Sequence, residues 1–146
     1  TIGIAQDSPP PPQDPFTGGQ EKAMQALGVV AYSPLRWADQ LSTTDVDRVL
    51  GESRILWIET EHFRIGSTLK TANIPDDVTA RKDLQDECAR LNKKWSKLPK
   101  RPKKIEPWYR LHLYAQRAED MYADFAELVG SKDGSTAAGK YLGLPE

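Results

Sequence analysis

The residues that could carry chemistry in this sequence are few and widely separated. His62 and His112 are the two histidines, and Cys88 is the single cysteine. A structural zinc site needs about four ligands, usually closely spaced, and neither an HExxH pair nor a CxxC pair occurs. The sequence also lacks a glycine-rich phosphate loop and a nucleophile elbow. We therefore expect a non-catalytic protein without a metal or another cofactor.

Each of these three residues has an ordinary structural interpretation. Cys88 occupies an apolar position of a helical pattern, which predicts a small buried side chain rather than a nucleophile. His62 follows Glu59 and Glu61, so we expect a surface contact between this histidine and a carboxylate. His112 stands between two leucines, which indicates the polar edge of a packed helix.

The strongest local feature is a run of positive charge. The residues 93–104, which we call the lysine loop, contain seven cations and no acid: Lys93, Lys94, Lys97, Lys100, Arg101, Lys103 and Lys104. Such a patch predicts docking to an acidic protein surface, to phosphate groups or to acidic lipid headgroups. The alternative is a solvated loop whose cations stabilise the end of the preceding helix. Nucleic acid is disfavoured, because the net charge is −1 and no nucleic-acid-binding motif occurs.

Aromatic and arginine residues gather just after the lysine loop, in the residues 108–117. These residue types are frequent at interaction hot spots, so Trp108 and Tyr109 are further candidates for partner binding. They are equally ordinary on a helix that faces a core while its polar ends reach water. Both interpretations stay open at the level of sequence.

The residues 1–19 predict an extended, proline-rich arm. Pro9, Pro10, Pro11 and Pro12 favour polyproline II geometry, and Phe16 is the aromatic residue of the arm. A proline-rich segment is held still only when another surface immobilises it, and that surface is either the domain itself or a partner. Our hypothesis is that these five residues contact a partner. A disordered tether is the alternative. The residues 131–146 predict a glycine-rich C-terminal tail.

A single domain is expected between the two ends, in the residues 20–130. Apolar spacing predicts a first helix over 20–32, an irregular turn over 35–40 and a short helix over 44–51. Thr44 is the expected N-cap of the short helix and Gly51 its C-cap. The residues 54–65 are rich in β-forming side chains and predict one bent strand or a strand pair.

Two long helices should complete the domain. The first begins near Pro75 and carries an apolar seam at heptad spacing, made of Leu84, Cys88, Leu91, Trp95 and Leu98. Pro107 opens the second, whose apolar face is wider. The expected fold is mainly α with a small β element, an α+β fold in which a long antiparallel helical hairpin packs on the strand region and on one or two short N-terminal helices.

Composition excludes a membrane-embedded protein, since 38% of residues are hydrophobic, 28% are charged and no apolar run reaches 18 residues. The segment Thr1–Ala5 is apolar, with small side chains at Gly3 and Ala5, as near a signal-peptidase site. It predicts export to the periplasm or cell envelope, either as a signal-peptide remnant or as the end of an apolar anchor. The alternative is that the segment Thr1–Ala5 is an arbitrary beginning of the sequence that is unrelated to export.

One segment resembles a known family. The phrase Thr60-Glu61-His62-Phe63-Arg64-Ile65, followed by helices that end in the residues 117–125, resembles the region ahead of the active site in exported zincin-like, peptidase-MA-like proteins. It also resembles bacterial envelope proteins of unknown function. The resemblance covers about half of the chain and implies an exported α+β domain. It does not imply peptidase activity, because the zinc motif of that family is missing.

These observations together predict a non-catalytic, exported accessory or structural subunit of a larger envelope or membrane-associated protein assembly. Docking would use the proline-rich arm and the lysine loop, and the partners would be other protein subunits. Two alternatives stay open. In the first alternative, the chain is the N-terminal, non-catalytic module of a zincin-like hydrolase whose active site lies beyond residue 146. In the second, it is a small-ligand binding domain.

Overall fold

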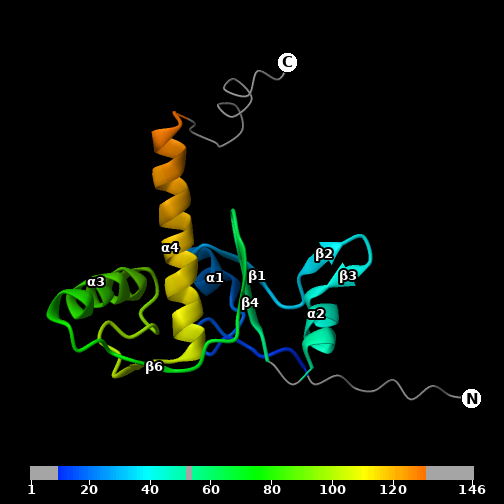
Figure 1. Ribbon diagram of the computed structural model, residues 1–146, viewed down its shortest axis with the longest axis horizontal. Coiled ribbons are helices and arrows are strands. Elements are labelled where there is room, and N and C mark those ends of the chain that lie inside the picture. The colour runs from blue at the N-terminus through cyan, green and yellow to red at the C-terminus, as the bar shows by residue number, and fades with distance from the viewer. Residues whose placement is uncertain (1–9, 52–53, 131–146) are drawn as a thin grey trace, which may run out of the picture.

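A computed structural model describes the residues 10–51 and 54–130 of the chain. These residues form four α-helices and seven strands, and the strands are arranged in three small sheets (Figure 1). The expectation of a mainly helical fold with one small β element is therefore wrong. Pro9, the segment Thr1–Ala5 and the predicted tail 131–146 lie outside the described residues.

The largest sheet has three antiparallel strands, in the order β1-β4-β5. Strand β1 spans Val29–Tyr32, β4 spans Leu56–Thr60 and β5 spans Arg64–Ser67. The expected strand region thus forms a hairpin of β4 and β5, with Ile58 opposite Ile65, and β1 adds a third strand. Helix α4, Pro107–Leu128, packs on this sheet, where its residues Leu111 and Ala115 join Val29 and Ile58 in one core cluster.

The first helix is shorter than the sequence predicts. Helix α1 spans Glu21–Leu27, and Gly28 ends it in the left-handed conformation, with φ of 71°. Glycine adopts this conformation without a Cβ penalty and is therefore the usual helix terminator. The β-branched Val29 and Val30 then enter strand β1. The expected helix over 20–32 is wrong in its second half for this reason.

A small unit follows β1 in the chain. Strands β2, Arg36–Ala38, and β3, Leu41–Ser42, form a two-stranded sheet where an irregular turn was expected. Helix α2, Thr43–Leu50, comes next and confirms the short helix with Gly51 at its end. Its N-cap is Ser42 rather than Thr44, because the Asp45 carboxylate accepts a hydrogen bond from the Ser42 backbone at 2.8 Å.

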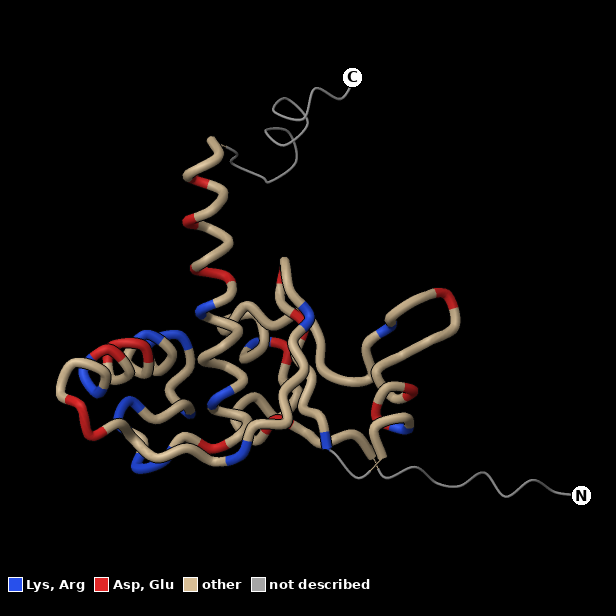
Figure 2. Tube along the Cα trace, in the orientation of Figure 1, with Lys and Arg blue, Asp and Glu red and all other residues tan. Residues whose placement is uncertain are grey.

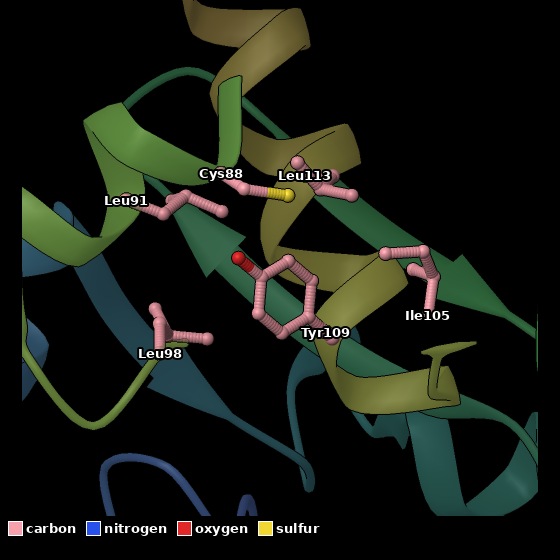
Figure 3. Packing of buried hydrophobic residues seen from close by; sticks show 6 residues of the cluster. All are labelled: Cys88, Leu91, Leu98, Ile105, Tyr109 and Leu113. Atoms are coloured by element: carbon pink, nitrogen blue, oxygen red, sulfur yellow. The ribbon is translucent and has the colours of Figure 1, made fainter. Parts of the chain in front are cut away.

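Helix α3 spans Val78–Lys94. Asp77 is its N-cap, and the Asp77 side chain accepts a hydrogen bond from the Ala80 backbone N–H at 2.8 Å. The predicted seam is confirmed in its packing. Cys88, Leu91 and Leu98 are buried in a cluster with Ile105, Tyr109 and Leu113 of the following segments, and Leu84 and Trp95 pack against it (Figure 3). The prediction that Cys88 is a small buried side chain is likewise confirmed, since it is 1% exposed.

The prediction of a long antiparallel helical hairpin is wrong. Figure 1 shows α3 running across α4 instead of alongside it. The connection between the two helices is a structured segment, in which Leu98 is fully buried and strand β7, Lys104–Ile105, pairs with strand β6, Ala72–Asn73. The two helices are therefore joined by a segment that belongs to the core and to a sheet, and not by a tight turn.

Ion pairs fix the crossing of the two helices. Arg90 on α3 makes two hydrogen bonds of 2.9 Å with Asp120 on α4, and Arg117 donates to Glu87 at 2.8 Å. The bidentate geometry of the first pair sets the relative orientation of the two elements as well as joining them.

Candidate docking surfaces

The lysine loop lies on the surface with all of its cations exposed. Figure 2 shows several blue segments along the chain that links α3 to α4. Within the described part of the chain, none of the seven basic groups lies within 4.0 Å of a carboxylate. Lys94 makes one polar contact, a hydrogen bond of 3.4 Å to the Gln116 side chain. Carboxylates of the residues 10–51 and 54–130 therefore do not neutralise the charge of the loop by direct ion pairs.

The backbone of the lysine loop is anchored to the core. The Asn92 side chain donates to the Leu98 carbonyl at 2.8 Å, and the Tyr109 hydroxyl donates to the Pro99 carbonyl at 2.8 Å. Leu98 itself is buried between them. Because these hydrogen bonds anchor the backbone at Leu98 and Pro99, the cations of the loop project from an ordered backbone.

The second half of the predicted arm belongs to the folded body. Pro10 and Pro11 are exposed and Pro12 is half-buried, whereas Phe16 packs edge-on against Tyr109 with ring centroids 5.7 Å apart. The Trp95 indole donates to the Phe16 carbonyl at 2.9 Å. The surface that immobilises this part of the arm is thus the protein's own core, and Phe16 is an internal anchor.

A buried polar network, which the sequence did not reveal, fixes the arm to α4. The Oδ2 atom of Asp14 accepts hydrogen bonds from the Thr17 hydroxyl at 2.7 Å and from the Tyr32 hydroxyl at 2.8 Å, and the His112 Nε2 atom lies 2.9 Å from it. The Oδ1 atom accepts from the Phe16 backbone N–H at 3.0 Å. Asp14, Thr17 and His112 are 1%, 0% and 2% exposed.

The network stabilises the ionised form of Asp14. Burial alone would raise the pKa of this carboxyl, but the hydrogen bond and electrostatic attraction of His112, with the donors on Thr17 and Phe16, outweigh burial and hold the pKa well below its ordinary value. Burial raises the pKa of Tyr32 far above its ordinary value, and the adjacent Asp14 carboxylate adds to this. The Tyr32 hydroxyl therefore stays protonated and donates.

One sequence signal could have located Asp14. The stretch Asp14-Pro15-Phe16-Thr17-Gly18 has the composition of a turn in which an aspartate side chain accepts from the backbone two residues later. The signal predicts the turn but not its partner, because His112 lies 98 residues away. The prediction that His112 forms the polar edge of a helix understates its burial.

The two aromatic candidates after the loop take structural positions. Tyr109 is 1% exposed and its ring lies in the core cluster, so its side chain is not accessible to a partner (Figure 3). Burial raises the pKa of Tyr109 far above its ordinary value, and the neighbouring Cys88 adds to this. Trp108 is half-buried and meets Tyr32 edge-on at a centroid distance of 5.6 Å.

The turn between β4 and β5 rests on α4. The His62 Nδ1 atom lies 2.7 Å from the Glu119 Oε2 atom, and the His62 ring stacks on Tyr122 with centroids 3.6 Å apart. The expected contact between His62 and an acid is confirmed. Its main partner comes from α4, while Glu61 lies at 4.0 Å. Burial alone would raise the pKa of Glu119, but its interactions with Thr60 and His62 lower it.

A cleft of about 410 Å³ lies between α3, α4 and the β6–β7 pair. Its wall includes the apolar side chains Leu84 and Leu113 and the cations Arg110 and Arg117. Both arginines already have partners, because Arg110 donates to the Lys70 carbonyl at 2.6 Å and Arg117 pairs with Glu87. A third charged group of the wall, Asp83, is exposed and has no ion-pair partner among the described residues.

Neither a metal-binding cluster nor a membrane-spanning helix occurs among the residues 10–51 and 54–130. No group of three or more histidine, cysteine, aspartate or glutamate side chains there could hold a metal ion. None of the helices within 10–51 and 54–130 combines the length and apolar character required to cross a bilayer.

Comparison with known proteins returns no match to a family model, a curated protein or a solved structure. The resemblance of the residues 60–65 and 117–125 to exported zincin-like proteins therefore stays a prediction.

Proposed function

We propose that the chain is a non-catalytic, exported accessory subunit of a larger assembly in the cell envelope, and that it docks to an acidic protein surface through the lysine loop. The observation that supports this proposal is the set of seven exposed cations without a carboxylate partner among the described residues. Unpaired charge of one sign, held on a fixed backbone, steers an oppositely charged partner and sets its register.

The structure changes the role of the arm in this proposal. Phe16 is an internal anchor and Tyr109 is buried, so neither contributes to the docking surface. The exposed Pro10 and Pro11 remain candidates for partner contact, together with the half-buried Pro12 and Trp108. Pro9 lies outside the described residues.

The test is carboxyl-to-amine cross-linking of the full chain in cells that produce it naturally, followed by mass spectrometry. Lysines of the loop should cross-link to acidic residues of one reproducible partner protein. Lys97→Glu, Lys100→Glu and Arg101→Glu together should abolish these cross-links, because the loop would then repel an acidic surface.

A matched control has the same change in net charge at other exposed sites, namely Lys22→Glu, Arg54→Glu and Lys70→Glu. This control should retain the cross-links. If both triple variants lose them equally, or if the loop lysines cross-link to no partner, the docking proposal fails. An HExxH motif encoded after Glu146 would instead favour the hydrolase-module alternative.

A further inference from the structure

A second surface on the molecule carries exposed apolar side chains. Met121, Phe125 and Leu128 on α4 are 62%, 60% and 84% exposed. Their spacing of four and three residues places them on one face of the helix. We call this face the distal stripe. Figure 1 shows that the C-terminal half of α4, which carries it, extends beyond α3 and the three-stranded sheet.

Near its middle, α4 has partners on two other sides. On one side, the hairpin turn covers Tyr122 and Glu119 through the stacked His62 ring. On another side, α3 holds Asp120 through Arg90. These contacts lie at or before Tyr122. Beyond it the apolar side chains of the distal stripe are exposed, as are the flanking Asp124 and Glu127, and the same spacing continues back toward the partly exposed Tyr114.

The charge beside the stripe indicates what covers it. The residues 118–130 contain four acids and no lysine or arginine, and Figure 2 shows only red charged segments there. Glu119 and Asp120 are paired, whereas Asp124 and Glu127 are exposed and have no ion-pair partner in the described chain. Both stand in the last turns of α4, where the helix dipole favours cations and disfavours carboxylates.

A cationic partner would relieve this unfavourable arrangement, and a second copy of the same helix would worsen it. Self-pairing of the stripe would bring two anionic segments together, and like charges across such an interface are destabilising. An acidic lipid surface is disfavoured for the same reason. The occupant that fits both the apolar spacing and the charge is a basic amphipathic helix.

We propose that the distal stripe binds an amphipathic helix of another protein, with apolar residues at i, i+3 or i+4, and i+7, and with lysine or arginine along its flank. From Tyr114 to Leu128 the stripe extends about 21 Å, which corresponds to a partner helix of about 14 residues. This surface is separate from the lysine loop, so the inference does not depend on the proposed function.

The probe is a synthetic helix made of leucine at heptad a and d positions and lysine elsewhere, and its counterpart replaces every lysine with glutamate. Fluorescence anisotropy of the labelled peptides is measured against the full chain at about 0.15 M salt. The leucine–lysine peptide should bind at the stripe. The leucine–glutamate peptide should not bind there, so any affinity that it has for the lysine loop should be the same in the wild type and in Phe125→Ser. Phe125→Ser should weaken binding at least tenfold, and Asp124→Lys with Glu127→Lys should reverse the preference between the peptides.

Val49→Ser is the matched control, because Val49 on α2 is 84% exposed and lies outside the stripe. It should leave the affinity unchanged. Phe125 is itself exposed, so its serine variant should remain folded, which circular dichroism checks. Equal binding of the leucine–lysine peptide by the wild type and Phe125→Ser overturns the inference. So does sedimentation showing a dimer that Phe125→Ser converts to a monomer, since the occupant would then be a second copy.

Discussion

Asp14 shows how one side chain can join distant parts of a chain. Its carboxylate accepts hydrogen bonds from the turn that follows it, from β1 through Tyr32 and from α4 through His112. A buried carboxylate is expensive unless its oxygens are satisfied and a partner balances its charge. The oxygens of Asp14 are satisfied by these donors, so the arm is joined to the domain by a specific polar contact as well as by packing.

Asp14→Asn should reduce the free energy of unfolding by about 1–3 kcal/mol, the usual cost of leaving a buried polar group unsatisfied. Both Asp14 oxygens accept, so either orientation of the new amide directs an N–H group at another donor. Urea unfolding followed by the fluorescence of the four tryptophans measures the change. The exposed Asp86→Asn should stay within about 0.5 kcal/mol of the wild type.

The same measurement repeated at lower pH checks the cause of this loss. A carboxyl whose pKa is lowered by folding contributes its full stability above the unfolded pKa of about 3.9 and loses it as the pH falls toward the folded value. The difference between wild type and Asp14→Asn should therefore be full at pH 7 and smaller below about pH 4. A difference that does not change with pH would contradict the assigned role of the carboxylate.

At the scale of elements, the pairing of β4 with β5 depends on a residue without a side chain. Gly66 stands opposite Trp57, and a Cβ atom at this position would lie 2.7 Å from the Cζ3 atom of the indole ring. The Trp57 indole donates to Asp47 of α2 at 3.2 Å, which fixes the ring. The tryptophan thus links the sheet to the neighbouring unit only because position 66 leaves room for it.

Gly66→Ala should lower the free energy of unfolding by about 1–3 kcal/mol, because the added methyl group overpacks the ring. In a Trp57→Leu background the same substitution should cost much less. Chemical denaturation of the two single variants and the double variant gives the coupling between them. Strictly additive effects would show that the ring is not what excludes a side chain from position 66.

The elements also show what could be predicted from the sequence. The burial of the seam was predictable, because all five of its residues meet the same core cluster, although α3 ends at Lys94 and Trp95 and Leu98 follow it in the chain. The strand after Gly28 was missed, although a glycine followed by two valines carries the signal, because helical spacing continues through it by coincidence.

Other errors had non-local causes. The helical hairpin was wrong because the pairing of Ile105 with Ala72 is a contact between segments far apart in the chain. Asp14 was missed as a network centre for the same reason. Of the candidate site, the exposure of the lysine loop followed from its composition. The burial of Tyr109 did not, since aromatic residues suit a core and an interface equally well.

At the scale of the whole molecule, the two halves of α4 differ in how deeply they are buried. Its first half is buried, with Tyr109, Leu111, Leu113 and Ala115 in the core, whereas no residue of its last two turns is buried. Local stability follows the density of buried apolar contacts. The two halves of one continuous helix should therefore differ in how often they open.

Hydrogen–deuterium exchange should show this difference directly. The amides of 121–128 should exchange faster than those of 109–116, and the leucine–lysine peptide should slow exchange in the first range only. Mass spectrometry of overlapping peptides provides the measurement. Uniform protection along α4 would indicate that the distal half is already stabilised by contacts of its own.

The contact between Asp14 and His112 has a consequence for biosynthesis. The two residues are separated by 98 positions, so a growing chain must expose its N-terminal turn until nearly all of the domain has been made. Contacts of such long sequence separation form late and slow the approach to the native state. During translation, the contact between Asp14 and His112 cannot form until α4 emerges, and a chain stopped before His112 lacks this partner for the Asp14 carboxylate.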